Sequence, residues 1–136
     1  MMNEENLIRV NWYYYSIKEQ YKFINRLIKN IQCNPYCYQF LNESLNDYRT
    51  SLILFKKSLE IFDESFSHKK FNDEIIYKMK DIYLRRSLMN INKTIIEIKQ
   101  KLPHILEDIL IRQLLNLLVE LFNRIRNLIR LLEISK

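Results

Sequence analysis

Apolar residues recur in steps of three and four along four segments of the chain, which is the spacing of one face of an α-helix. The first segment runs from about Asn11 to Ile31, and its apolar face consists of Tyr13, Ile17, Tyr21, Ile24, Ile28 and Ile31. The second begins at Pro35, a residue well suited to the first position of a helix, and its apolar stripe continues to Phe62. We therefore expect helices over 11–31 and 35–62.

The second half of the chain predicts two more helices after a polar connection. The stretch 63–72 is polar and loses the periodicity, so we expect a loop there. A third helix is expected over 73–101, where two offset apolar stripes predict more than one neighbour and Pro103 ends the helix. A fourth is expected over 104–133, where two adjacent seams of leucine and isoleucine form a wide apolar arc.

The composition narrows the fold class further, because the 136 residues contain no glycine. Tight hairpin turns and the phosphate-binding loops of P-loop, Rossmann and kinase folds all depend on glycine, so these architectures are excluded. The length is that of one domain. We therefore predict a single all-α domain over 1–136, an elongated and mostly antiparallel bundle of four or five long helices.

The apolar arc on the fourth segment is wider than one helix–helix contact requires. We expect part of it to bind a protein partner, in a homo-oligomer or a hetero-oligomer, since large exposed apolar stripes mark partner sites. The expected contact residues on this segment are Leu114, Leu117, Leu118, Leu121, Phe122 and Ile125. The alternative is that the four helices bury all of these residues among themselves.

A run of four aromatic residues, 12–15 (WYYY), covers the whole circumference of the first predicted helix. At least one of them must point away from that helix's own apolar face. Tryptophan and tyrosine are common interface anchors, so Trp12 and Tyr14 are candidate partner-binding residues. The alternative is that they fill the end of the bundle.

The net charge of +6 and the pI of about 9.3 are compatible with an acidic partner or a nucleic acid. The candidate phosphate contacts are Arg85, Arg86, Arg126 and Arg130. Acidic residues are interspersed with the basic ones, and this pattern is more typical of a solvated helix face.

No combination of residues predicts catalysis. Cys33 and Cys37, together with His68 and His104, have the residue types of a zinc site, but Pro35 interrupts the pair and the spacing is unusual. Glu-x-x-His motifs, which di-iron bundles require, do not occur. We therefore expect no catalytic residue, no metal and no cofactor, and buried or free thiols at the cysteines.

The first residues are acidic and no apolar signal segment follows them, so we expect an intracellular, cytoplasmic protein. The most apolar stretch, 105–132, contains several charged residues and is not expected to enter a membrane.

The order of these segments resembles the helical A domain of the GINS replication-complex subunits, in particular the archaeal type in which the helices come first. The likeness rests on a tyrosine-rich first helix, on 34–41 (NPYCYQFL) at the start of the second, and on 82–86 (IYLRR). Arg85 stands where that family has an arginine, whereas Leu88 and Met89 replace its lysine and isoleucine. The resemblance implies a scaffold that pairs with a sister subunit and associates with the MCM helicase.

Taken together, the sequence predicts a non-catalytic helical scaffold that binds proteins, with a GINS-like replication factor as its named form. A general helical adaptor or a viral host-interaction protein is one alternative. A small basic nucleic-acid-binding subunit is the other.

Overall fold

The computed structural model describes residues 2–32, 35–101 and 109–134, which contain helices and no strand. The all-α prediction is therefore confirmed. The third long helix consists of three consecutive parts, because a π-helical segment, η1, joins two α-helical ones without a break. The elements are α1 (Glu4–Gln32), α2 (Pro35–Ser67), α3 (Asp73–Tyr77), η1 (Lys78–Leu84), α4 (Arg85–Lys101) and α5 (Ile109–Ile134).

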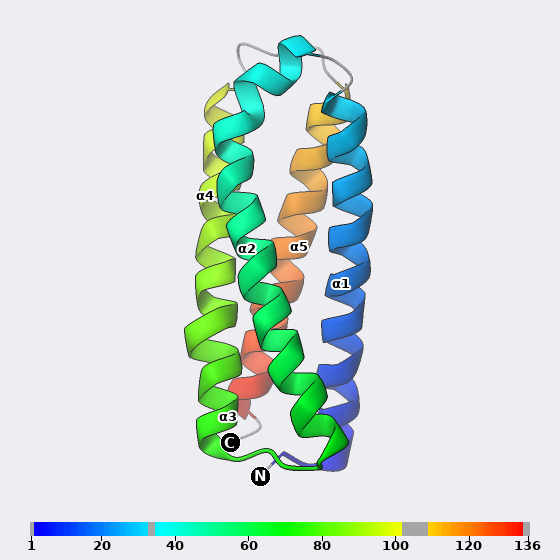
Figure 1. Cartoon of the computed structure of the whole chain (residues 1–136), viewed down its shortest axis with the longest axis vertical. Helices are drawn as coiled ribbons and strands as arrows, with labels where there is room; N and C mark the ends of the chain where they lie inside the picture. The colour runs from blue at the N-terminus through cyan, green and yellow to red at the C-terminus, as the bar shows by residue number, and fades with distance from the viewer. Residues whose placement is uncertain (1, 33–34, 102–108, 135–136) are drawn as a thin grey trace.

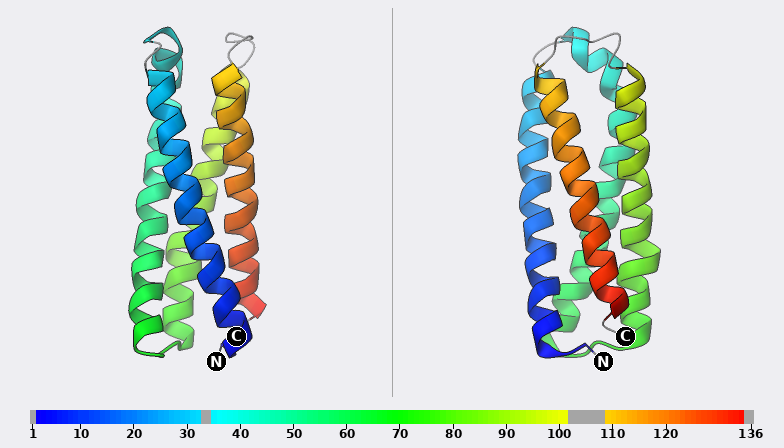
Figure 2. Two further views of the ribbon diagram at one scale, coloured as in Figure 1. Left: turned by 90° about the vertical axis from the view of Figure 1, so that its right-hand side faces the viewer. Right: turned by 180° about the vertical axis from the view of Figure 1, so that it is seen from behind.

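The long helices run alternately up and down the bundle, so α1 begins and α5 ends at the same end of the molecule (Figure 1). α1 packs against α5 and α2, and α4 packs against α2 and α5, so each long helix has two neighbours. Seen from behind, α5 lies between α1 and α4 (Figure 2). The predicted antiparallel bundle is thus the observed architecture.

Two helices extend beyond their predicted limits. α1 begins at Glu4 instead of Asn11, because the Asn3 side chain caps it by accepting the backbone N–H of Asn6 at 2.8 Å. α2 continues through the first half of the expected loop to Ser67. The predicted start of the fourth helix at His104 lies outside the described residues, as do Pro103 and Cys33.

The end of α2 shows how a chain without glycine stops a helix. Lys69 takes a positive φ of 50°, the backbone conformation that glycine normally supplies after a helix. The backbone N–H of Lys70 donates to the carbonyl of Ser65 at 2.9 Å, which satisfies one of the last carbonyl groups of the helix. Asn72 then caps the next helix by accepting the N–H of Ile75 at 2.8 Å.

The offset between the two apolar stripes of the third predicted helix is explained by η1. A π-helical turn holds more residues than an α-helical one, so the face that points into the bundle changes along this segment. Met79 and Leu84 are both fully buried although they lie five positions apart. Lys80 is also brought inside, with its ammonium 3.5 Å from the carboxylate of Asp81.

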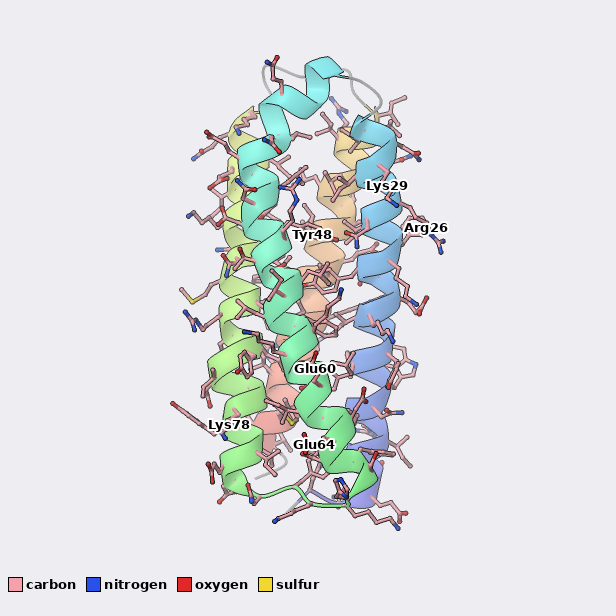
Figure 3. All side chains as sticks on the ribbon, viewed as in Figure 1. Arg26, Lys29, Tyr48, Glu60, Glu64 and Lys78 are labelled. Carbon is pink, nitrogen blue, oxygen red and sulfur yellow. The ribbon has the colours of Figure 1, made fainter. Side chains whose placement is uncertain are left out.

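The centre of the bundle holds a column of aromatic rings contributed by α1 and α2. Tyr14 stacks on Phe62 with ring centroids 4.7 Å apart, and Tyr21 packs against Phe55 at 5.2 Å. All four rings are buried. Tyr48 of α2 lies on the side that faces α1, and its hydroxyl donates to the side-chain oxygen Oδ1 of Asn25 at 2.7 Å (Figure 3).

A heptad stripe of small residues lies on the α2 face that packs against η1 and α4. Its four members are fully or almost fully buried, which lets the backbones of the two helices approach closely. Ser58 donates to the carbonyl of Met79 at 3.0 Å, and Ser87 donates to the carbonyl of Ser51 at 2.9 Å. The stripe consists of Ser44, Ser51, Ser58 and Ser65.

Two serines of this stripe, and Ser87 of α4, contact the buried tyrosine hydroxyls of α1. The hydroxyl of Tyr14 lies 2.7 Å from that of Ser58, and the hydroxyl of Tyr21 lies 3.2 Å from Ser51 and 3.3 Å from Ser87. Burial raises the pKa of Tyr21 to about 12, and burial also raises the pKa of Tyr14. These contacts join three helices through hydroxyl groups that would otherwise be unsatisfied.

Candidate functional site

The aromatic run of α1 is divided between the inside and the outside of the bundle. Tyr14 is fully buried and Tyr13 is half-buried, whereas Trp12 is 60% exposed and Tyr15 is 40% exposed. The prediction that Tyr14 is an interface residue is therefore wrong in this conformation, because its ring is already enclosed by the chain's own core. The exposure expected of Trp12 is observed.

Trp12 and Tyr15 belong to a larger apolar surface that sequence reasoning missed. Ile8 is 65% exposed and Phe23 is 57% exposed, and both lie on the same side of α1 as Trp12 and Tyr15, with the charged Glu19 between Tyr15 and Phe23. These positions share one side of α1, opposite the buried Tyr21 and its neighbours. We call Ile8, Trp12, Tyr15 and Phe23 the outer α1 face.

The aromatic side chains of this face have defined contacts. The rings of Trp12 and Tyr13 meet edge to face with centroids 5.0 Å apart. The hydroxyl of Tyr15 donates to the Asp63 carboxylate at 2.9 Å, and this hydrogen bond raises the pKa of Tyr15. The ammonium of Lys18 lies 5.4 Å from the centre of the Tyr15 ring. The rings of Trp12 and Tyr15 therefore have contacts within the chain before any partner arrives, which reduces the entropy that binding would cost.

The charged residues that border the outer α1 face differ between its two ends. The N-terminal end carries Glu4 and Glu5, and Glu5 pairs with Arg9 at 3.1 Å. The C-terminal half carries more bases, among them Lys22, which pairs with Glu19 at 3.2 Å.

The C-terminal end of the outer α1 face continues into a groove between α1 and α5. Phe23 lines both, and the groove has a volume of about 490 Å³. Its apolar residues include Leu27, Leu110 and Leu117, and Arg26 stands at its edge. Arg26 extends away from the bundle on this side (Figure 3).

The α5 residues that were predicted to contact a partner lie mainly inside the bundle, so the expectation of a free apolar arc on this helix is wrong. Because α5 packs against α1 on one flank and α4 on the other, both seams are covered by the same chain. Leu117 and Phe122 are the two candidates that stay half-buried. The fully buried ones are Leu114, Leu118, Leu121 and Ile125.

The four candidate arginines are exposed, two of them on α4 and two on α5. Arg85 pairs with Asp81 at 2.7 Å and also with Glu133 of α5. Arg126 donates to Asn123 at 3.1 Å and lies over the ring of Phe122. Arg86 lies on α4 and Arg130 lies on α5. Two of the four are therefore engaged within the chain.

The remaining surfaces show little that suggests chemistry. A second groove of about 720 Å³ lies between α2 and the α3–η1 segment, and His68, Glu64 and Glu74 lie among its lining residues. The described residues hold no cluster of three or more metal-ligating side chains. Cys33 and His104 lie outside the described residues, as does the side chain of Cys37.

Among the described helices, none combines the length and the apolar character needed to cross a bilayer. No protein-family model matches the sequence, and neither a curated protein nor a solved structure was found to be similar to it.

Proposed function

We propose that this protein is a non-catalytic helical module that binds a protein partner through the outer α1 face. The observation that carries the proposal is the clustering of large exposed apolar side chains on one side of one helix. In the described part of the chain, two aromatic residues on other helices are also exposed, Phe66 of α2 and Tyr77 of α3, whereas the outer α1 face carries three on one helix.

The residue types on this face also support binding. Tryptophan and tyrosine are enriched among the residues that contribute most to protein interfaces, because they bury a large area with few rotatable bonds. Burying a side chain such as Trp12 or Phe23 against a partner would contribute about 1.5–3 kcal/mol. The groove beside Phe23 offers a pocket for an apolar side chain of the partner.

The test is a binding experiment with two matched variants. Trp12→Lys places a charge on the outer α1 face, and Met89→Glu places one on α4 at a residue that is 71% exposed. Affinity purification from the native source is expected to lose the partner with Trp12→Lys and to retain it with Met89→Glu. Equal recovery with both variants would contradict the proposal.

The likeness to the GINS A domain gives the proposal one specific form, in which the partners are a sister subunit and the MCM helicase. Direct binding assays with purified MCM helicase test that form, and binding that disappears in Trp12→Lys would support it.

A further inference from the structure

We propose that the side of the bundle formed by α4 and α5 binds a nucleic-acid duplex through its phosphate groups, without reading the base sequence. This surface is separate from the outer α1 face, and the inference goes beyond the proposed function. The ligand is a regular row of phosphodiesters, which a DNA duplex or an RNA duplex supplies.

The charges of the chain are divided unequally between two sides of the bundle. α1 and α4 each pack against α2 and α5, so the α4–α5 pair lies opposite the α1–α2 pair. α1 and α2 together carry eight bases and eight acids. α4 and α5 together carry nine bases and three acids, an excess equal to the net charge of +6 of the whole chain. Bases concentrated on one side of a protein are typical of a nucleic-acid-binding surface.

The ion pair between Arg85 of α4 and Glu133 of α5 shows which flanks of the two helices meet at the surface. Arg126 and Arg130 precede Glu133 by seven and three positions, so they lie on the α5 flank next to α4. Lys99 follows Arg85 by 14 positions, nearly a whole number of turns, and lies on the α4 flank next to α5. These exposed bases, Arg85, Lys99, Arg126 and Arg130, are called the α4–α5 basic face.

The acids of α4 and α5 do not cancel this face. Glu120 lies toward α1, where its carboxylate is 3.5 Å from a side-chain amide. Glu97 follows Lys93 by four positions, and Lys93 pairs with an aspartate of α2 at 3.7 Å, so Glu97 lies on the flank next to α2. Glu133 is the one acid of α4–α5 that reaches the basic face in the described residues, and it pairs with Arg85.

Three of the four bases can bind a phosphate. Arg85 already has two carboxylate partners within the chain. Lys99 and Arg130 form no ion pair with any described residue, and Arg126 donates to the neutral amide of Asn123 at 3.1 Å. The two arginines suit a phosphate especially well, because a guanidinium can donate two parallel hydrogen bonds to its oxygens.

The shape of this side favours a duplex over a protein partner. α5 also exposes Arg112, and the helix rises about 27 Å from there to Arg130. One strand of a duplex carries about eight phosphates over that length. Among the described residues of α4 and α5, no aromatic side chain is exposed. The face therefore lacks the aromatic anchors common in protein interfaces and the stacking platforms of single-strand binders.

Fluorescence anisotropy with a labelled, arbitrary DNA duplex of about 20 base pairs tests the proposal through the salt dependence of binding. Three phosphate contacts predict that the dissociation constant rises about 40-fold between 50 and 200 mM KCl, because each contact releases condensed cations. An RNA duplex of the same length shows which of the two sources binds more tightly. A chain that binds neither duplex at 50 mM KCl, or binds without salt dependence, would overturn the proposal.

Two double variants with the same net charge locate the site. Arg126→Gln with Arg130→Gln is expected to weaken binding at least tenfold at the lowest salt and to reduce the slope of log K against log[KCl] by about 1.8. Lys22→Gln with Lys56→Gln removes two exposed bases from the opposite α1–α2 side and is expected to leave the slope unchanged. Circular dichroism checks that both variants fold. Equal losses in the two double variants would show that only net charge matters and would overturn the assigned face.

Labelled polyglutamate distinguishes a nucleic acid from an acidic protein. It is expected to bind more weakly than the duplex at the same concentration of charged groups, and equal or tighter binding would overturn the assignment to a nucleic acid. The test is independent of the proposed function. Arg126→Gln with Arg130→Gln is expected to retain the protein partner, and Trp12→Lys is expected to retain the duplex.

Discussion

The two faces of α1 use aromatic residues for different purposes. On the inner face, Tyr14 and Tyr21 are fully buried and their hydroxyls contact serines of α2 and α4. On the outer face, Trp12 and Phe23 are more than half exposed and have no comparable enclosure. The comparison teaches that the inner face holds the bundle together, whereas the outer face is available for binding and is expected to contribute little to stability.

The largest expected difference between the faces is in side-chain truncation. Tyr21→Ala removes a buried ring and is expected to lower the free energy of unfolding by about 3–5 kcal/mol. Phe23→Ala, two residues away and exposed, is expected to change it by less than about 0.5 kcal/mol. Urea unfolding of the isolated protein measures both. Similar losses in the two variants would show that the outer face is also part of the core.

The second-largest expected difference is the response to alkaline pH, which is expected to destabilise the bundle through the buried tyrosines of the inner face. The folded-state pKa of Tyr21 is raised to about 12 from an ordinary value of 10.0, so the unfolded chain loses this proton first. The contribution of the protonated Tyr21 hydroxyl to the free energy of unfolding is complete below pH 10.0. It is lost as the pH rises toward about 12, at about 1.4 kcal/mol per pH unit. Burial raises the pKa of Tyr48 in the same direction.

Denaturant unfolding measures this effect when the wild type and Tyr21→Phe are compared at several pH values between 8 and 11.5. The wild type is expected to lose stability more steeply than the variant above the ordinary tyrosine pKa of 10.0. If the free energy of unfolding falls with pH at the same rate in both proteins, burial does not raise the pKa of Tyr21.

The smallest expected difference concerns single hydroxyl groups. Tyr14→Phe removes a buried hydrogen bond to Ser58 and is expected to cost about 1 kcal/mol. Tyr15→Phe removes an exposed hydrogen bond to Asp63 and is expected to cost less than about 0.5 kcal/mol. Thermal unfolding of the two variants gives the comparison, and a larger loss for Tyr15→Phe would reverse the assignment of the faces.

The helices could be predicted from the sequence because their signals are local. The step pattern that predicts α2, and Pro35 at its start, depends only on neighbouring residues. η1 could not be predicted in the same way, although the offset apolar stripes around it gave a signal that the register changes. The extension of α2 to Ser67 buries Ser65, and the positive φ of Lys69 follows it, neither of which the step pattern indicates.

The inner and outer faces of α1 were harder to separate. Tyr13 and Tyr14 lie four and three positions before Ile17, so both are compatible with the apolar stripe, and the structure buries Tyr14. The spacing of Ile8, Trp12, Tyr15 and Phe23 forms a second stripe that Glu19 interrupts. Its exposure depends on how many neighbours α1 has, which is a property of the whole bundle.

The prediction of a partner interface on α5 was wrong for the same reason. A wide apolar arc indicates how much of a helix is buried and does not say which chain buries it. Leu114 and Leu121 are covered by the chain itself because α5 has neighbours on two flanks.

The most direct test of the central claim uses the fluorescence of Trp12, which is the only tryptophan in the chain and lies on the outer α1 face. If a protein partner covers this face, the emission maximum is expected to move to shorter wavelength, and acrylamide quenching to decrease, when the partner is added. Emission that keeps the position and quenching of a solvent-exposed indole in the associated protein would contradict the account.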